Sequence, residues 1–392
     1  MTPLKPPPLG IYVHLPWCVR KCPYCDFNSH TRRPGKIPEQ SYISALLQDL
    51  ERDLAQLPLS DREVSSIFIG GGTPSLFSPD SIAVLLEGIS NRLKIEDDVE
   101  ITLEANPGAA DADRFRGFRQ AGVNRLSIGI QSFDDRHLAR LGRIHDRQDA
   151  FKAIEAAHAT GFESFNLDLM YALPEQTVAE AVTDVKLACE LGDGHLSHYQ
   201  LTLEPGTVFA QYPPNLPDDD TAWQMHQQSL EVIAAAGLAR YEISAYARPG
   251  TRCRHNLNYW EFGDYLGLGA GAHGKVTDIT GDTIVRTTKP SSPQTYLRSI
   301  ADGDCAVTTF VAPSERPIEF FMNALRLIDG TTLALFSQRT GLAASAAASG
   351  LSRARELGLL ITNGTHIAPT KLGLRYLNEL LVQFMPTDST GH

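Results

Sequence analysis

Three cysteines near the start of the chain have the spacing of a metal-binding loop. The segment WCVRKCPYCDF places Cys18, Cys22 and Cys25 as C-x3-C-x2-C, directly after a short strand-like run. Iron–sulfur clusters are held by cysteine thiolates, and three ligands on a four-iron core leave one iron open to a small molecule. The spacing therefore predicts a 4Fe-4S cluster on these three residues.

Two alternatives to a cluster stay open for these cysteines at this point. A structural zinc site needs four closed ligands, so His14 or His30 would have to complete the set. Three inert cysteines can also meet at this spacing by chance. The remaining cysteines, Cys189, Cys253 and Cys305, are scattered, which fits reduced thiols better than disulfides in a chain without an export signal.

Length, composition and charge limit the class of protein. The chain has 392 residues, 42% of them hydrophobic, which favours one large globular domain with a smaller one. Its formal net charge is -11 and it has no Lys/Arg-rich run, so nucleic-acid binding is disfavoured. No apolar stretch is long enough for a signal peptide or a membrane span, which predicts a cytoplasmic location.

The elements that position the cysteines follow a repeated pattern. From residue 11 to about residue 236, short β-branched runs alternate with amphipathic stretches, as in β-α units with a parallel sheet. Six such units predict an α/β fold, a partial (β/α)6 TIM-like barrel. The predicted strands are Ile11–His14, Ser66–Ile69, Val99–Glu104, Arg125–Gly129, Phe165–Leu169 and Ser197–Leu203. The predicted helices are Tyr42–Leu57, Pro79–Leu93, Ala112–Ala121, Asp134–Leu141, Asp149–Thr160, Val178–Leu191 and Thr221–Ala236.

The rest of the chain has a different pattern. Residues 240–310 are rich in Gly, Pro, Arg and aromatic residues, which predicts extra strands and loops over the barrel mouth. Three helical stretches follow, and Asn363–Gly364 then marks a type I′ hairpin, an order that resembles a winged-helix module. The acidic balance favours packing or partner binding over DNA binding for this module. The predicted helices are Glu315–Ile328, Leu333–Thr340 and Ala343–Leu357, and the predicted domains are 1–240, 241–312 and 313–392.

Polar residues accumulate where the predicted strands end. Glu104 lies in LEANP, Gln131 in GIQSF and Asp168 in NLDLMYALP, and the glycine run Gly70–Gly72 follows the second strand. The carboxyl ends of the strands carry the site in β/α barrels, and a buried carboxylate needs a partner or a ligand. One such residue can be a satisfied barrel group, but three in register, with Arg143 in LGRIH, favour a ligand site.

These motifs together resemble a known superfamily. The CVRKCPYC loop, with the aromatic Tyr24 before its last cysteine, is similar to the loop of radical S-adenosylmethionine (SAM) proteins. Over most of residues 11–310 the chain resembles the anaerobic coproporphyrinogen III dehydrogenase family of that superfamily. The resemblance implies that the open iron binds and reductively cleaves SAM to a 5′-deoxyadenosyl radical. The SAM contacts that it implies are Tyr12, Tyr24, Gly71, Gly72, Thr73, Glu104, Gln131, Arg143 and Asp168.

Two departures and one further motif single out a sister group. Phe27 stands where the porphyrinogen enzyme carries another cysteine, and only ten residues precede the first strand. Both features resemble the HemW group of heme chaperones, whose heme-binding motif HNxxYW is similar to HNLNYW at residues 255–260. By this resemblance His255, Tyr259 and Trp260 bind heme, since imidazole ligates iron and aromatic faces suit a porphyrin. Cys253 is a weaker alternative ligand.

A glycine-rich run near this motif only partly matches a nucleotide site. Residues 267–274, GLGAGAHG, imitate a dinucleotide-binding loop but follow no suitable strand–helix unit. They are interpreted as a turn-rich segment near the barrel mouth. Whether His273 faces a porphyrin or caps the turn stays open.

The resemblance implies a function and leaves alternatives. It implies a heme chaperone that binds heme and passes it to apo-hemoproteins such as respiratory cytochromes. The alternative is an oxygen-independent coproporphyrinogen III oxidase, a radical SAM oxidative decarboxylase, and a third is a radical enzyme that modifies another substrate. The resemblance also implies a homodimer with peripheral membrane association when the cluster is present, and no nucleic-acid partner is expected.

Overall fold

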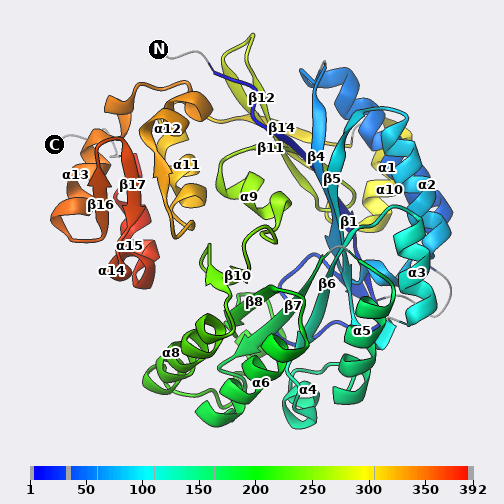
Figure 1. Ribbon diagram of the computed structural model, residues 1–392. Helices are drawn as coiled ribbons and strands as arrows, with labels where there is room; N and C mark the ends of the chain where they lie inside the picture. Colours follow the sequence, from blue (N-terminus) through cyan, green and yellow to red (C-terminus); the bar gives the residue numbers. More distant parts are fainter. Residues whose placement is uncertain are drawn as a thin grey trace.

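One twelve-stranded sheet organises the molecule. The computed structural model describes residues 4–31, 37–59, 61–109, 111–162, 164–303 and 305–386. Within these ranges the strand order is β14-β13-β12-β11-β1-β4-β5-β6-β7-β8-β10-β9. Six neighbouring strands are parallel and form the curved wall seen in Figure 1. They are β1 (Leu9–Leu15), β4 (Glu63–Gly71), β5 (Lys94–Ala105), β6 (Arg125–Gln131), β7 (Ser164–Tyr171) and β8 (His195–Gln200).

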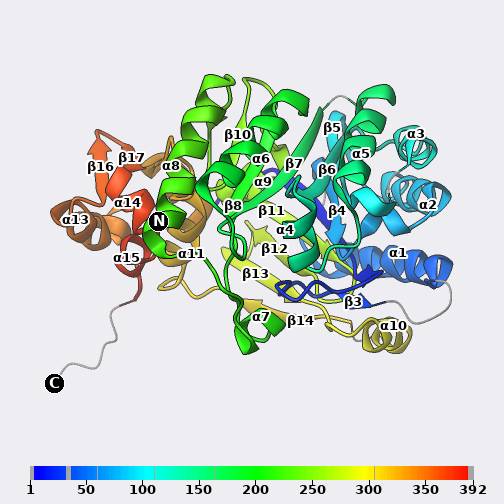
Figure 2. The same ribbon diagram turned by 90° about the horizontal axis from the view of Figure 1, so that it is seen from below.

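Most of the helices between these strands cover the outer face of the wall (Figures 1 and 2). Ser78, Asp111, Thr177 and Asp218 begin four of them, each accepting a hydrogen bond from a backbone N–H of the first turn. Strands and helices together confirm the predicted partial (β/α)6 barrel. The helices are α1 (Glu39–Gln56), α2 (Pro79–Ser90), α3 (Ala112–Gln120), α4 (Asp135–Arg140), α5 (Arg147–Ala159), α6 (Val178–Leu191), α7 (Val208–Gln211) and α8 (Asp219–Ala235), with short 3-10 turns at Pro74–Leu76 and Pro107–Ala109.

The segment after α8 belongs to the same sheet and extends it at both ends. Strand β11 is parallel to β1, with Ile11 opposite Leu266, so the barrel has a seventh parallel strand that was not predicted. For residues 240–310 only strands and loops were predicted, and this was wrong because two helices, α9 and α10, form there. Helix α9 lies on the concave side of the wall (Figure 1). The elements are β9 (Ala239–Arg240), β10 (Ala245–Ala247), α9 (Arg254–Trp260), β11 (Asp264–Leu268), β12 (His273–Asp278), β13 (Thr283–Thr288), α10 (Pro293–Asp302) and β14 (Val307–Phe310).

The C-terminal elements lie on the side of the molecule opposite α1–α3 and pack around a second hydrophobic core, to which Phe262 and Ile284 of the preceding segment also contribute (Figures 1 and 2). Helices precede a small antiparallel sheet, as predicted, but Asn363 pairs with His366, so the turn residues are Gly364–Thr365, one later than expected. The domain boundaries at 240 and 312 stay predictions. The elements are α11 (Arg316–Ala324), β15 (Thr331–Thr332), α12 (Leu333–Thr340), a 3-10 turn (Ala344–Ala347), α13 (Ala348–Glu356), β16 (Leu360–Asn363), β17 (His366–Pro369), α14 (Lys371–Arg375) and α15 (Leu377–Val382).

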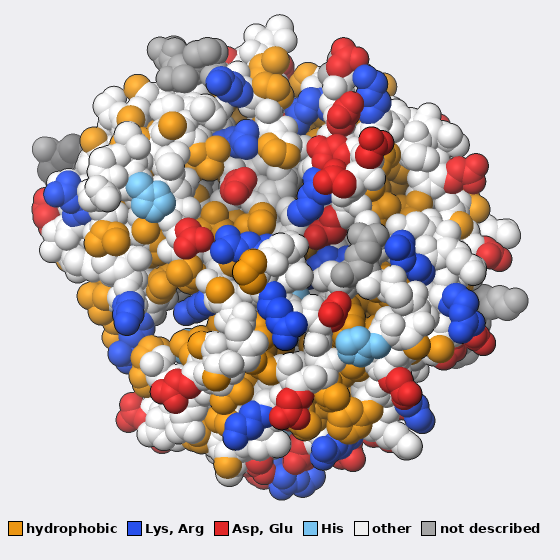
Figure 3. Space-filling model, in the orientation of Figure 1, with side chains coloured by type: hydrophobic (Ala, Val, Ile, Leu, Met, Phe, Trp, Pro, Cys, Tyr) orange, Lys and Arg blue, Asp and Glu red, His pale blue; other side chains and the backbone are white. Residues whose placement is uncertain are grey.

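The surface is mixed in charge. Figure 3 shows Lys/Arg and Asp/Glu side chains interspersed over one face, without a continuous basic region there. In the described part of the chain, no helix combines the length and the apolar character needed to cross a bilayer.

Candidate functional site

The three cysteines of the motif lie on one loop between β1 and α1. Strand β2 (Trp17–Cys18) pairs with β3 (His30–Thr31), and the His30 N–H donates to the Pro16 carbonyl at 2.7 Å. Both ends of the loop are therefore held together. Cys18 is buried, whereas Cys22 and Cys25 are partly exposed, and all three line one large cavity.

Each cysteine sulfur has its own polar neighbour. Polar side chains near a sulfur orient a metal ligand, so these surroundings suit cysteines that bind a cluster. The pairs are Thr73 Oγ1 with Cys18 Sγ (3.6 Å), Ser29 Oγ with Cys25 Sγ (3.7 Å) and Arg143 Nη1 with Cys22 Sγ (3.9 Å).

The geometry disfavours the zinc alternative. The His14 ring is engaged on both sides, by the Tyr12 hydroxyl at 2.9 Å and the Asn28 carbonyl at 2.8 Å, and His30 Nε2 lies 3.1 Å from the Asn28 side-chain oxygen. A tetrahedral zinc ion would hold sulfurs about 3.8 Å apart. Among the described residues, only one group of three ligand-type side chains has all its ligand atoms within 4.8 Å of one another, and it does not contain these cysteines. The three sulfurs are therefore spread more widely than a zinc ion requires, as a larger inorganic core needs.

Asn28 anchors the cysteine loop to a distant part of the chain. Its side-chain N–H groups donate to the carbonyls of Ala270 and Ser291, both at 2.9 Å. The Ala270 N–H in turn donates to the Tyr42 hydroxyl at 2.8 Å. No motif marks Asn28 in the sequence, and its role becomes visible only through these long-range contacts.

The glycine run after β4 packs directly against the cysteine loop. Gly71 has a φ of 120°, and a Cβ there would lie 2.7 Å from the His14 ring, while a Cβ on Gly72 would lie 2.7 Å from the Trp17 carbonyl. Only glycine fits such a close approach. The Gly72 N–H donates to the Leu15 carbonyl at 2.9 Å, so this amide is already occupied within the protein.

Gln131 ends β6 as predicted, whereas Asp168 lies inside β7 and not at its end, and the two side chains line the same cavity. Gln131 adopts a left-handed φ of 69° at a bulge, a strained conformation that places its side chain beside Tyr199, whose hydroxyl donates to Gln131 Oε1 at 2.7 Å. Arg143 donates to the Gly129 carbonyl at 2.8 Å. Asp168 accepts from Ser127 at 3.0 Å and from Asn166 at 2.7 Å, and burial raises its pKa.

Glu104 is poised between its two protonation states. It accepts a hydrogen bond from the Gly71 N–H at 3.1 Å. Burial, reinforced by the Asp168 carboxylate, raises the pKa of Glu104 from 4.5 to about 7. A carboxylate in this environment gains from a cationic ligand, such as an ammonium or sulfonium group, that would replace its proton.

We expect Glu104→Gln to stabilise the metal-free protein at high pH. Between pH 4.5 and 7 the folded state keeps a proton that the unfolded chain has released, so its stability falls as pH rises through this window. The amide avoids this loss, and the free energy of unfolding should increase by about 1–2 kcal/mol at pH 8 and little at pH 4.5. Urea unfolding at both pH values measures it, with the exposed Glu190→Gln as control. Equal effects of Glu104→Gln at both pH values would contradict the prediction.

Helix α9 is held in the barrel by a carboxylate from the sheet. Glu100 on β5 accepts the backbone N–H groups of Arg254 at 3.0 Å and His255 at 3.1 Å, which satisfies the first turn of the helix. The Asn258 side chain donates to the Asp264 carbonyl at 2.8 Å. These contacts fix the direction in which the helix presents its side chains.

His255 is buried and has one unsatisfied ring nitrogen. Its Nδ1 lies 3.0 Å from the Ser66 hydroxyl, while its buried Nε2 has no hydrogen-bond partner among the described residues. The ring stacks on Phe68 at 5.2 Å and meets the edge of Tyr259 at 4.9 Å. Burial, aided by the nearby Arg125 guanidinium, lowers its pKa to about 3. The imidazole is therefore neutral, which is its metal-ligating form.

The other candidates near this histidine differ in their surroundings. Trp260 lies under the Arg326 guanidinium, 4.4 Å from the ring centre, and its Nε1 also lacks a partner in the described part of the chain. His273 is exposed at the cavity rim, 3.2 Å from the Thr288 hydroxyl. The buried Cys253 thiol points to Glu100 at 3.4 Å and does not line the cavity, so its alternative role as ligand loses support.

Every residue predicted for the cluster, SAM or heme lines one cavity of about 900 Å³. This volume lies within the usual range for cofactor and ligand sites. The cavity extends from the cysteine loop at the carboxyl ends of the strands to α9 near their amino ends. It is also lined by residues that no sequence motif marked, among them Arg125, His195 and Ser244.

The glycine-rich run at 267–274 serves a different purpose from nucleotide binding. It is the tight connection between the neighbouring strands β11 and β12, and a helix does not follow it. A Cβ on Gly267 would lie 1.9 Å from the His273 carbonyl. The glycines allow two backbones to approach, as expected for a turn.

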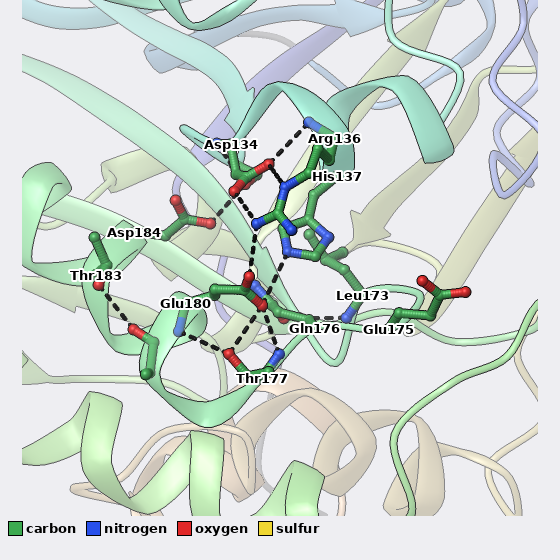
Figure 4. Close-up of polar contacts among 12 residues, drawn as sticks. Asp134, Arg136, His137, Leu173, Glu175, Gln176, Thr177, Glu180, Thr183 and Asp184 are labelled. Atoms are coloured by element: carbon green, nitrogen blue, oxygen red, sulfur yellow. Dashed lines mark hydrogen bonds and ion pairs between the residues drawn. The ribbon is translucent and has the colours of Figure 1, made fainter.

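A second group of ligand-type side chains lies outside the cavity between α4 and α6 (Figure 4). Asp134, His137 and Glu180 gather within 4.8 Å. Their carboxylates are already engaged, because Arg136 bonds both at 2.7 Å and Thr177 donates its N–H to Glu180 at 2.8 Å. This group is therefore a helix-capping ion-pair network.

The comparisons with known proteins agree with this geometry. The sequence matches the radical SAM superfamily over residues 12–188 and the HemN C-terminal domain over residues 311–376. It is 50% identical over 384 residues to the heme chaperone HemW of Haemophilus influenzae, covering 97% of this chain and 99% of that protein. It is 48% identical over 387 residues to the heme chaperone HemW of Escherichia coli, covering 97% of this chain and 99% of that protein.

Among solved structures, the fold is similar to that of coproporphyrinogen III oxidase (HemN) from Escherichia coli. The TM-score is 0.81 at 24% identity, and the match covers 97% of this chain and 90% of that chain. This likeness supports the barrel and the C-terminal domain as a common architecture. The identity to full-length relatives confirms the resemblance drawn from the motifs, and the chain belongs to the HemW family of the radical SAM superfamily.

Proposed function

We propose that this chain is a heme chaperone that binds heme in the central cavity and passes it to apo-hemoproteins. We further propose that Cys18, Cys22 and Cys25 hold a 4Fe-4S cluster with SAM at its open iron. The single observation that carries the heme assignment is the buried Nε2 of His255, which has no partner among the described residues. The names of the full-length relatives support the same function.

The surroundings of His255 suit an iron ligand. Ser66 engages Nδ1, which fixes the orientation of the ring and leaves Nε2 as the ligating atom. An unsatisfied polar atom in a buried position is costly unless a ligand completes it. Phe68, Tyr259 and Trp260 add aromatic faces that suit the apolar plane of a porphyrin.

The other end of the cavity suits the cluster and SAM. Glu104 offers a carboxylate for an ammonium or sulfonium group, Arg143 a guanidinium for a carboxylate, and Gln131 an amide for either kind of polar group. When bound and reduced, the cluster supplies an electron to SAM. The chain's own residues orient the ligand and hold it within the cavity.

The proposed partners follow from the proposed cargo. Delivery requires apo-hemoproteins as acceptors, and a homodimer with peripheral membrane association is proposed for the form that carries the cluster. Phe27 is 63% exposed and lines the cavity. This side chain is an apolar ring at the position where the coproporphyrinogen enzyme carries a further cysteine.

Heme titration of the anaerobically reconstituted protein tests this function. We expect stoichiometric uptake, followed by optical and electron paramagnetic spectra, and transfer to an added apo-hemoprotein. An assay with coproporphyrinogen III, SAM and a reductant is run beside it. No heme uptake together with steady formation of protoporphyrinogen would refute the proposal and favour the oxidative decarboxylase.

A further inference from the structure

A buried arginine of the cavity also has side-chain atoms without hydrogen-bond partners, and it carries a charge. Arg125 begins β6, lines the cavity and is only 4% exposed. Its Nε and Nη2 are buried, and neither has a hydrogen-bond partner among the described residues. A buried guanidinium whose donors lack hydrogen-bond acceptors is costly, so its position in a ligand cavity calls for an anionic partner at closer range.

The acidic neighbours of Arg125 are committed to other groups. Glu100 Oε2 lies 3.9 Å from Nε, beyond hydrogen-bond distance, and this carboxylate already accepts the N–H groups at the start of α9. Asp168 is held by Ser127 and Asn166. The nearby Cys253 is a neutral thiol, because burial raises its pKa to about 12.

The remaining groups around Arg125 are neutral. Both ring nitrogens of His195 are occupied, Nδ1 by Asn166 at 2.7 Å and Nε2 by Tyr241 at 2.9 Å, and burial keeps the pKa of this imidazole well below its usual value. Within the described part of the chain, the positive charge of Arg125 is therefore uncompensated at hydrogen-bond distance. The planar guanidinium has donors placed to bind a carboxylate through two oxygens.

The proposed function offers carboxylates from two sources, the methionine part of SAM and the propionates of heme. Arg125 and Gln131 lie six residues apart on β6, which corresponds to roughly 20 Å along a strand. The carboxylate of SAM, bound at the open iron beside the cysteine loop, would lie at the Gln131 end of the strand, away from Arg125. His255 is much closer, because Glu100 bonds its N–H and also faces the Arg125 guanidinium.

We propose that Arg125 binds a propionate carboxylate of the heme whose iron is held by His255, and thereby selects porphyrins with a free carboxylate. This inference rests on the proposed function. The two residues would then recognise different parts of the same ligand: His255 binds the iron, and Arg125 binds a carboxylate at the edge of the macrocycle.

Heme and its dimethyl ester provide the test, because the ester removes the carboxylate charge without changing the iron. The anaerobically reconstituted full chain should bind heme at least about tenfold more tightly than the ester. In Arg125→Gln this preference should shrink to within about threefold, through weaker binding of heme alone. Arg125→Lys, which keeps the charge but not the planar donors, should lie between them. Arg298→Gln, an exposed arginine on α10, should keep the wild-type preference.

The outcomes separate this inference from the function it rests on. If the wild type binds heme through His255 but shows no preference over the ester, or if Arg125→Gln keeps the full preference, the Arg125 assignment fails alone. If Arg125→Gln instead loses SAM affinity while it keeps the heme preference, the carboxylate belongs to SAM and the assignment is also overturned. Absence of heme uptake by the wild type would overturn both. The wild-type comparison does not depend on any variant folding.

Discussion

Replacing Cys18, Cys22 and Cys25 together by alanine should reduce bound iron and sulfide to background and abolish the cluster absorbance. The other thiols cannot substitute for them. Cys253 and Cys305 are buried and lie against the carboxylates of Glu100 and Asp49 at 3.4 and 3.5 Å. Iron and sulfide analysis after anaerobic reconstitution measures the effect, which is a complete loss rather than a graded one.

The variant should still fold and bind heme, because the barrel core and α9 do not depend on these sulfurs. Only Cys18 of the three is buried, so the loss of side-chain packing is small. The control is Cys189→Ala, which removes the partly exposed thiol on α6; this variant should take up the cluster as the wild type does. Retention of a full complement of cluster iron in the triple variant would place the cluster elsewhere.

Substitution of His255 by alanine should weaken heme binding by at least roughly tenfold and remove the spectral signature of imidazole ligation. The expected loss is large because the variant removes the Nε2 atom and also leaves a space between Phe68 and Tyr259. Cluster absorbance should stay intact, because His255 lies on α9 and the cysteines lie on the loop after β1. Heme titration with optical and paramagnetic spectra measures both properties on one sample.

His273→Ala is the matched control for this prediction. His273 lines the same cavity but is exposed at its rim, so its removal costs little packing. We expect wild-type heme affinity and spectrum for this variant. If the heme spectrum were normal in His255→Ala but changed in His273→Ala, His273 and not His255 would be the iron ligand.

The regular barrel could be predicted from sequence because its signal is local. The strand Ile11–His14 is short and mostly apolar, Phe165–Leu169 alternates apolar with polar residues, and capping residues such as Thr177 precede the helices. Helix α9 was missed because Asn, His, Tyr and Trp are poor helix formers. It forms where Glu100, more than 150 residues earlier in the sequence, satisfies its first N–H groups.

Site residues that belong to a sequence motif could be predicted, whereas site residues outside any motif could not. The cysteine spacing, the glycine run and HNLNYW all identified residues that line the cavity. Arg125 and Asn28 were missed because an isolated arginine or asparagine has no pattern. Their surroundings are set by non-local pairing, including β11 beside β1, which brings residues 264–268 next to the start of the chain.

The anchor formed by Asn28 has a consequence for biosynthesis. The cysteine loop leaves the ribosome early, but the carbonyls of Ala270 and Ser291 that hold it are translated much later in the 392-residue chain. The loop therefore cannot make these two hydrogen bonds until both acceptor residues have been translated. Because such long-range contacts form late, we expect the cysteine loop to reach its closed conformation only near the end of synthesis or after it.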